Sequence, residues 1–151
     1  NVDDKETLQG IVSALSRVSE DLPLIFPIHP RTRKNLTAFD ISLDGTVTMT
    51  EPLSYMEFLN LWKDAALVLT DSGGIQEETT ALGIPCLTLR ENTERPITIS
   101  EGTNALVGSS PTTIVAEAGK ILSGTIKAGK RPELWDGQAA ERIVEILRQK
   151  L

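Results

Sequence analysis

At 151 residues and 16.4 kDa, the chain has the length of one globular domain and can bury roughly 70% of the surface that its unfolded form exposes. Its 15 basic and 21 acidic residues give a net charge of −6, which argues against nucleic-acid binding because such proteins present a basic face. The single cysteine leaves no disulfide framework or thiolate metal cluster, and the lack of a signal peptide or a long apolar run predicts a soluble, cytoplasmic protein without membrane contact.

The first half of the chain alternates predicted helices and strands. Asp3 or Asp4 can cap a helix whose apolar residues recur at helical spacing, namely Leu8, Ile11, Val12, Leu15 and Val18. The apolar run at 22–29 predicts a buried strand, 31–37 a short helix, and 46–50 a second strand. Ser54 then caps a helix with one apolar face, formed by Tyr55, Phe58, Leu59 and Trp62.

The second half continues this alternation. A strand at 66–70 precedes a helix at 74–82 that Gly83 ends. Two more strands are predicted at 85–90 and 104–108, and two helices at 111–122 and 137–151. The strands are apolar throughout, which is typical of strands buried on both faces, so the pattern predicts an α/β fold with a parallel sheet flanked by helices. Ligands of such folds bind beyond the carboxyl ends of the strands.

The stretch LTDSGGIQEE at 69–78 lies directly behind one of these strands. Glycines in a strand-to-helix turn allow positive φ and let a ligand touch the backbone. The amides of Gly73, Gly74 and Ile75 would be unpaired donors at the helix start, with the hydroxyl of Ser72 beside them, which predicts a phosphate cradle. The alternative is a turn that only caps the helix, because the stretch lacks the Lys of a P-loop and the spacing of G-x-G-x-x-G.

Two carboxylates follow one turn into that helix. Glu77 and Glu78 are too far from its tip to repel a phosphate, and a carboxylate there can accept hydrogen bonds from both hydroxyls of a ribose. A phosphate cradle with a ribose acceptor predicts a site for a nucleoside diphosphate. The alternative is a solvated helix face whose acids are favoured by the helix dipole.

Four linked motifs resemble the signature of one enzyme family. D-S-G-G-x-Q-E-E occurs at 71–78, G-x-P-x-L-x-x-R at 83–90, T-E-R-P at 93–96 and G-T at 102–103. The chain therefore resembles the non-hydrolysing UDP-N-acetylglucosamine 2-epimerases over essentially its whole length. The resemblance implies the Rossmann-like C-terminal domain of a glycosyltransferase-B type fold. Asn1 falls where the family's H-R-x-x-N motif ends, so we expect 1–151 to be the nucleotide-sugar (UDP) binding domain, a fragment of a longer two-domain enzyme.

The resemblance also assigns ligand contacts to positions in this sequence. Ser72 and the amides of Gly73 and Gly74 would hold the diphosphate, and Glu78 would bind the ribose hydroxyls. Arg95 in T-E-R-P would reach the phosphate side of the substrate.

Four further positions belong to the base and to the domain boundary. The backbone around Phe58 and the segment at Leu53 would border the uracil, although some family members carry a hydrogen-bonding Gln in place of Leu53. His29 and Arg31 have two interpretations. His29 would either lie between the domains near an activating second substrate molecule, or be a strand-end histidine hydrogen-bonded to backbone, which we favour. Arg31 would serve an anion or solvate a helix.

The family reaction inverts C2 of UDP-N-acetylglucosamine (UDP-GlcNAc) to give UDP-N-acetylmannosamine (UDP-ManNAc). UDP is eliminated to leave a 2-acetamidoglucal and is then added back with the opposite configuration at C2, without a metal or redox cofactor. The catalytic carboxylates belong to the N-terminal half, so we expect no catalytic residue and no activity in 1–151 alone. The resemblance implies UDP and a UDP-N-acetylhexosamine as ligands, the N-terminal half as a partner, a homodimeric parent enzyme, and a role in cell-surface polysaccharide biosynthesis.

Two other functions stay open from the sequence. A UDP-sugar glycosyltransferase shares the fold and a carboxylate on the ribose, but such enzymes usually lack T-E-R-P. A non-catalytic nucleotide-binding module is the second alternative.

Overall fold

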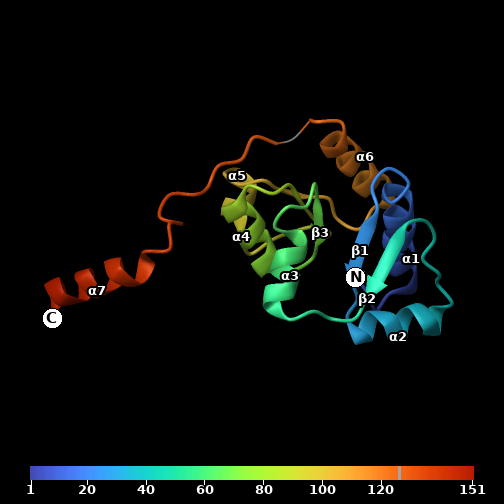
Figure 1. Ribbon diagram of the computed structural model, residues 1–151, viewed down its shortest axis with the longest axis horizontal. Coiled ribbons are helices and arrows are strands. Elements are labelled where there is room, and N and C mark those ends of the chain that lie inside the picture. The colour runs from blue at the N-terminus through green and yellow to red at the C-terminus, as the bar shows by residue number, and fades with distance from the viewer. Residues whose placement is uncertain (126) are drawn as a thin grey trace.

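The computed structural model describes residues 1–125 and 127–151 and has the predicted α/β class, with helices and parallel strands alternating along the chain (Figure 1). The elements are α1 (Lys5–Val18), β1 (Leu24–Pro27), α2 (Pro30–Phe39), β2 (Val47–Thr50), α3 (Tyr55–Trp62), β3 (Val68–Thr70), α4 (Gly73–Leu82), β4 (Cys86–Thr88), α5 (Pro96–Ser100), β5 (Asn104–Leu106), α6 (Pro111–Leu122) and α7 (Ala139–Lys150). All the predicted elements are present, and α5 is an additional short helix that the sequence pattern did not reveal.

The strands form two parallel sheets instead of the single sheet that the sequence predicted. β1 pairs with β2 from Leu24↔Val47 onward, and β3, β4 and β5 form the second sheet in that order. Both sheets contribute to one hydrophobic core, because side chains of β1 and β3 pack against the same buried cluster, which contains residues of α1, β4 and α6. The two sheets therefore share a core although no hydrogen bond is recorded between β1 and β3 in the described part of the chain.

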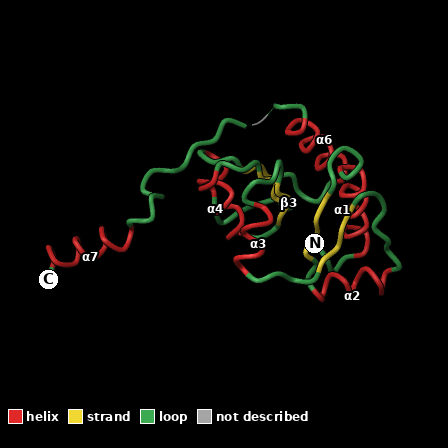
Figure 2. The backbone as a smooth tube through the Cα atoms, viewed as in Figure 1, coloured by secondary structure: helices red, strands yellow, loops and turns green. Residues whose placement is uncertain are grey.

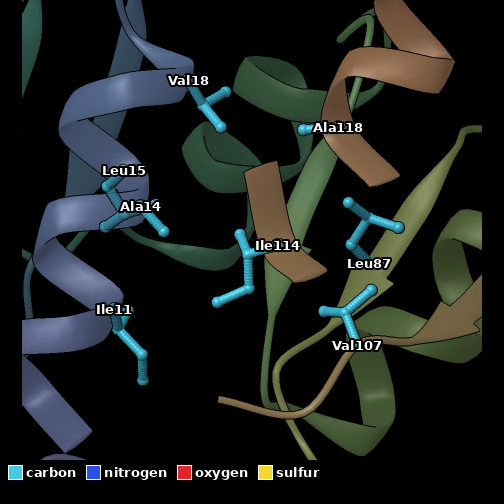
Figure 3. Close-up of a cluster of buried hydrophobic side chains, with 8 residues drawn as sticks. All are labelled: Ile11, Ala14, Leu15, Val18, Leu87, Val107, Ile114 and Ala118. Carbon is cyan, nitrogen blue, oxygen red and sulfur yellow. The ribbon is translucent and has the colours of Figure 1, made fainter. Parts of the chain in front are cut away.

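Helix α1 supplies most of one wall of this core. The carboxylate of Asp4, one of the two caps that the sequence analysis considered, caps the helix by accepting a hydrogen bond from the amide of Thr7 at 2.8 Å. Figure 3 shows the α1 side chains facing α6 and the second sheet; the eight residues of the cluster are Ile11, Ala14, Leu15, Val18, Leu87, Val107, Ile114 and Ala118. Burial of this apolar stripe fixes α1 and α6 on one face of the strands.

The opposite face of the second sheet is covered by α3 and α4 (Figure 2). Trp62 of α3, Val68 of β3 and Ile84 form a second buried cluster, against which Phe58 and Ile75 pack. This cluster holds the start of α4 against the end of α3. Both helices therefore keep a fixed place beside the carboxyl end of β3.

The expectation of strands buried on both faces is confirmed for β4 and is wrong for β1. Every residue of β4 is buried, because helices cover the second sheet on both sides. Ile25 of β1 is 53% exposed, since α1 and α2 cover only one face of the first sheet. Apolar composition alone does not distinguish these two situations.

Helix α7 lies away from the rest of the chain (Figure 1). None of its residues, all of which are described, is buried, and its apolar side chains Ile143, Val144, Ile146 and Leu147 are exposed. No helix in the described ranges is both long and apolar enough to span a membrane.

Candidate nucleotide-binding site

The turn after β3 is only two residues long, because α4 already begins at Gly73. The amide of Ser72 donates to Thr70 Oγ1 at 3.1 Å, which fixes the entry of the chain into the helix. Ser72 is the N-cap residue, but within the described chain its side chain makes no capping hydrogen bond. The first amides of a helix also lack intrahelical partners. The helix start therefore offers a hydroxyl and several amides to an anion, with the positive end of the helix dipole behind them.

Gly73 and Gly74 have ordinary backbone conformations and room around their Cα atoms. They do not use the positive φ that glycine permits: the glycines with positive φ in the described ranges are Gly45, Gly83, Gly108, Gly124 and Gly137. A Cβ on Gly73 would lie 4.0 Å from the nearest atoms, which belong to Arg95, and one on Gly74 would lie 3.9 Å from Ser72 Oγ. Both distances are ordinary contacts, so neither packing nor backbone conformation requires glycine here. The nearest atoms to both glycines are the side chains of Arg95 and Ser72, so the helix start is lined by a guanidinium and a hydroxyl.

Glu78 lies on the flank of α4 that faces α3. Tyr55 donates from its hydroxyl to Glu78 Oε1 at 3.3 Å, which is long for a hydrogen bond between oxygens. The nearby carboxylate raises the pKa of Tyr55. Oε2 of Glu78 is buried and has no hydrogen-bond partner among the described residues. A half-buried carboxylate with an unused oxygen has acceptor capacity that the protein itself does not fill.

Glu77, which is rotated about 100° from Glu78 around α4, pairs with Arg95, the N-cap residue of α5. Glu77 Oε1 is 2.9 Å from Arg95 Nε, and both side chains are 41% exposed. Arg95 Nε makes no aligned hydrogen bond within the described chain, so this contact is a charge pair rather than a directed bond. The Arg95 side chain also passes 4.0 Å from the Cβ position of Gly73. The structure thus brings a guanidinium beside the amides at the helix start.

The residues predicted to border a base lie around the start of α3. Ser54 and Glu57 form a capping box there, with the Ser54 amide donating to Glu57 Oε2 at 2.9 Å. Phe58 is half-buried and meets the ring of Trp62 edge-on, with 6.4 Å between ring centroids, whereas Leu53 is exposed. The Tyr55–Glu78 hydrogen bond connects this end of α3 to α4.

A buried polar cluster under α4 was missed by the sequence analysis. Gln76 is fully buried, and its Oε1 accepts from Thr93 Oγ1 at 2.6 Å and from Asn104 Nδ2 at 3.2 Å. These residues come from three different motifs, D-S-G-G-x-Q-E-E, T-E-R-P and the segment after G-T. Their order along the sequence could not reveal that they touch.

His29 and Arg31 lie apart from this site. His29 Nδ1 accepts from the backbone amide of Arg31 at 3.1 Å and caps α2, which is the backbone-bonded arrangement that we favoured. Arg31 binds the carboxylate of Asp3 through two of its nitrogens, one of them at 2.9 Å. The contacts recorded for the described residues do not join either side chain to α4.

The described parts of the chain contain no cluster of side chains suited to bind a metal ion. No group of three or more His, Cys, Asp or Glu in residues 1–125 and 127–151 is placed to hold a metal ion. Cys86 is fully buried in β4, and burial raises the pKa of its thiol to about 11.

Comparison with known proteins gives a consistent picture. The sequence model of a family described as UDP-N-acetylglucosamine 2-epimerase matches residues 1–148. A UDP-N-acetylglucosamine 2-epimerase of Methanocaldococcus jannaschii is 44% identical over 97% of this chain and 41% of the relative. A UDP-2,3-diacetamido-2,3-dideoxy-D-glucuronate 2-epimerase of Pseudomonas aeruginosa is 38% identical over 97% of this chain and 41% of the relative. The chain therefore spans about two fifths of the length of these relatives.

Solved structures agree with these sequence matches. The crystal structure of the M. jannaschii UDP-GlcNAc 2-epimerase in complex with UDP-GlcNAc and UDP superposes with a TM-score of 0.85 at 43% identity. The superposition covers 99% of this chain and 42% of that structure. The arrangement of helices and strands is therefore the one found in part of a nucleotide-sugar enzyme.

Proposed function

The chain belongs to the UDP-N-acetylglucosamine 2-epimerase family, and from that premise we propose that the start of α4 binds UDP on behalf of a longer two-domain enzyme. Ser72 and the amides of Gly73 and Gly74 hold the diphosphate, and Glu78 accepts hydrogen bonds from the ribose hydroxyls. The backbone near Phe58 and Leu53 borders the uracil.

The buried Oε2 atom of Glu78 carries this proposal. Among the described residues, Oε2 has no hydrogen-bond partner, and Oε1 accepts one long hydrogen bond from Tyr55. A buried carboxylate oxygen without a partner is costly unless something else satisfies it. Two vicinal hydroxyls of a ribose supply the missing donors. The open helix start lies one to two turns away on the same helix, which is the direction in which a diphosphate extends from the ribose.

The names of the relatives support UDP as the recognised part. The M. jannaschii and P. aeruginosa proteins are named for different sugars, yet both sugars are linked to UDP and both proteins are named 2-epimerases. Both are matched by nearly the whole of this chain. We therefore assign this chain to the nucleotide and leave the choice of sugar to the rest of the enzyme.

The proposed reaction of the whole enzyme interconverts UDP-GlcNAc and UDP-ManNAc. UDP leaves C1 as the proton is lost from C2, and it returns to the 2-acetamidoglucal after a proton is added to the opposite face of C2. The task of the residues named here is to retain UDP between the two steps, and the Ser72 hydroxyl and the helix-start amides stabilise its developing negative charge through hydrogen bonds. The acid–base groups come from the other half, in a homodimeric cytoplasmic enzyme without metal or redox cofactor, so 1–151 alone is inactive.

The test is calorimetric titration of UDP and of 2′,3′-dideoxy-UDP into the chain and its Glu78→Ala variant. Hydrogen bonds to charged groups contribute about 1.5–3 kcal/mol, so the loss of one lowers the affinity for UDP by roughly 10- to 150-fold. Glu117→Ala on α6 is the matched control. It also removes a glutamate carboxylate, but one that forms a salt bridge with Lys120 on the surface.

Two results would contradict the ribose assignment. One is a Glu78→Ala variant that binds UDP as tightly as the unmodified chain, and the other is equal affinity for UDP and its dideoxy analogue. Conversion of UDP-GlcNAc by pure 1–151 would contradict the division of labour between the two halves.

A further inference from the structure

We propose that Thr93 and Thr98, held by the buried amides of Gln76 and Asn104, are positioning residues that clamp the backbone of Arg95, so that its guanidinium meets the phosphate end of the nucleotide. This inference rests on the proposed function. It concerns residues that do not touch the ligand themselves.

The first half of the clamp acts on the Arg95 amide. Thr93 Oγ1 accepts from that amide at 2.9 Å and donates its own proton to Gln76 Oε1 at 2.6 Å. One hydroxyl therefore links the arginine backbone to a side chain of α4, the helix whose start is the proposed phosphate site. Because Gln76 is fully buried, its Oε1 cannot exchange this donor for water.

The second half acts on the Arg95 carbonyl. Thr98 donates to that carbonyl from its hydroxyl at 2.7 Å and from its amide at 3.0 Å. Asn104 Nδ2 in turn donates to Thr98 Oγ1 at 3.1 Å. Thr98 is fully buried, so the carbonyl is tied to the start of β5 by a path that excludes solvent.

Asn104 joins the two halves and fastens them to the sheet. Its Nδ2 also donates to Gln76 Oε1 at 3.2 Å, and its Oδ1 accepts from Thr88 Oγ1 of β4 at 2.7 Å. Thr88, Gln76 and Asn104 are each 0% exposed. Hydrogen bonds therefore hold the peptide unit on each side of Arg95 in a fixed position relative to β4, β5 and α4.

The side chain that leaves this clamp reaches the site. Arg95 passes 4.0 Å from the Cβ position of Gly73 and forms its charge pair with Glu77, both on α4. Stability alone does not account for the cluster, because buried polar groups contribute little net free energy and Gln76 Nε2 has no partner among the described residues. Such a network does fix one geometry, which is what a phosphate contact requires.

The test compares Thr93→Val, which removes both hydrogen bonds of the hydroxyl at constant shape, with Thr93→Ser, which keeps them. Affinities for UDP and for uridine are measured by NMR titration of the 151-residue chain. Thr93→Val lowers UDP affinity about tenfold, the low end for loss of a charged contact, and changes uridine affinity less than about twofold. Thr93→Ser stays within about twofold for both ligands, and Arg95→Ala reproduces the selective loss.

A second readout follows the clamp without ligand. The Arg95 amide exchanges with solvent faster in Thr93→Val than in Thr93→Ser, because its acceptor is removed.

The outcomes separate this inference from the proposed function. Equal losses for UDP and uridine in Thr93→Val, or no loss for either, overturn the positioning role while leaving UDP binding intact. If the unmodified chain binds no UDP, the proposed function fails. In that case unchanged exchange of the Arg95 amide in Thr93→Val overturns the clamp as well, and faster exchange supports it.

Discussion

The two edges of the second sheet use glycine in opposite ways. At the carboxyl edge, a Cβ on Gly73 or Gly74 would find its nearest atoms at 4.0 and 3.9 Å. At the amino edge, a Cβ on Gly102 would lie 2.4 Å from Thr80 Oγ1 and 2.7 Å from the carbonyl oxygen of Thr98. A Cβ on Gly129 would lie 2.7 Å from the backbone of Gly102. Glycine at the amino edge is therefore a packing requirement, and at the carboxyl edge it is not.

The amino edge is closed by a segment that we call the strap, residues 127–131. Its Lys127 ammonium donates to the carbonyl of Asn104 at 2.9 Å, the amide of Lys130 donates to the carbonyl of Glu101 at 2.8 Å, and Arg131 Nε donates to the carbonyl of Ala81 at 3.2 Å. At the carboxyl edge, nothing comparable covers α4 in the described part of the chain. At the carboxyl edge, the two glycines therefore leave room beside free helix-start amides, and the proposed function places the diphosphate there.

The largest effect is expected for Gly102→Ala. The new methyl group would overlap the buried side chain of Thr80 and a backbone oxygen, so the free energy of unfolding should fall by about 3 kcal/mol. Urea denaturation followed by circular dichroism measures the loss. Gly119→Ala on α6 is the control, because its Cβ meets nothing within 4 Å and alanine favours helix. Equal stability of both variants would break the contrast between the edges.

Gly74→Ala should give two changes of opposite sign. Alanine in the first turn of α4 raises the free energy of unfolding by about 0.5 kcal/mol, because it restricts the unfolded chain. The same methyl group fills the space above the helix start, so the affinity for UDP falls about tenfold, or about 1.4 kcal/mol. Parallel urea denaturation and calorimetric titration measure both quantities. A variant that is more stable and still binds UDP normally would show that no ligand approaches Gly74.

A smaller effect is expected for Lys127→Met in the strap. The substitution keeps the length of the side chain but removes the donor to Asn104, so the free energy of unfolding falls by about 1 kcal/mol. Lys34→Met, on the exposed side of α2, controls for the loss of one positive charge. UDP affinity should stay unchanged in both variants, since the strap lies at the other edge. A change in UDP affinity specific to Lys127→Met would mean that the edges are coupled.

The smallest effect is a change with pH at Asp136, which lies before α7 and away from both edges of the second sheet. Two nitrogens of Arg142 and the amide of Gln138 donate to the carboxylate of Asp136, and this lowers the pKa of Asp136 to about 2. Because the folded-state pKa lies below the ordinary value of 3.8, the contact is fully present above about pH 4 and is lost as the pH falls through about 2. The NMR chemical shift of the Gln138 amide should therefore change with pH with a midpoint of about 2. A midpoint near 3.8 would show that the Arg142 contact does not persist in solution.

Local signals explain most of what the sequence predicted correctly. Asp4 caps α1 and the apolar residues of that helix are buried, because capping and helical periodicity depend only on neighbours along the chain. The helix after β3 begins at the predicted motif for the same reason. The positions of Ser72 and Glu78 at the carboxyl edge followed from strand order alone.

The errors have a common physical origin in contacts between distant segments. The split into two sheets depends on which strand edges pair, and no single strand carries that information. The clamp around Arg95 joins residues from α4, the loop before α5, α5 itself and β5, so its members appeared only as separate residues of different motifs. The sequence also does not show whether Gly73 and Gly74 use the positive φ that glycine permits, because the backbone angles depend on how α4 packs; in the structure they do not.

Because Cys86 is buried, a label can be attached to an introduced cysteine without reacting with the native one. A thiol reacts as its thiolate, and a pKa of about 11 keeps that form scarce at neutral pH even before burial limits access. Cys86 is the only cysteine of the sequence, so the folded wild-type protein should not react with maleimide reagents. A fluorophore or spin label on a cysteine introduced at Leu53 would then report from one known position, without first removing a native thiol.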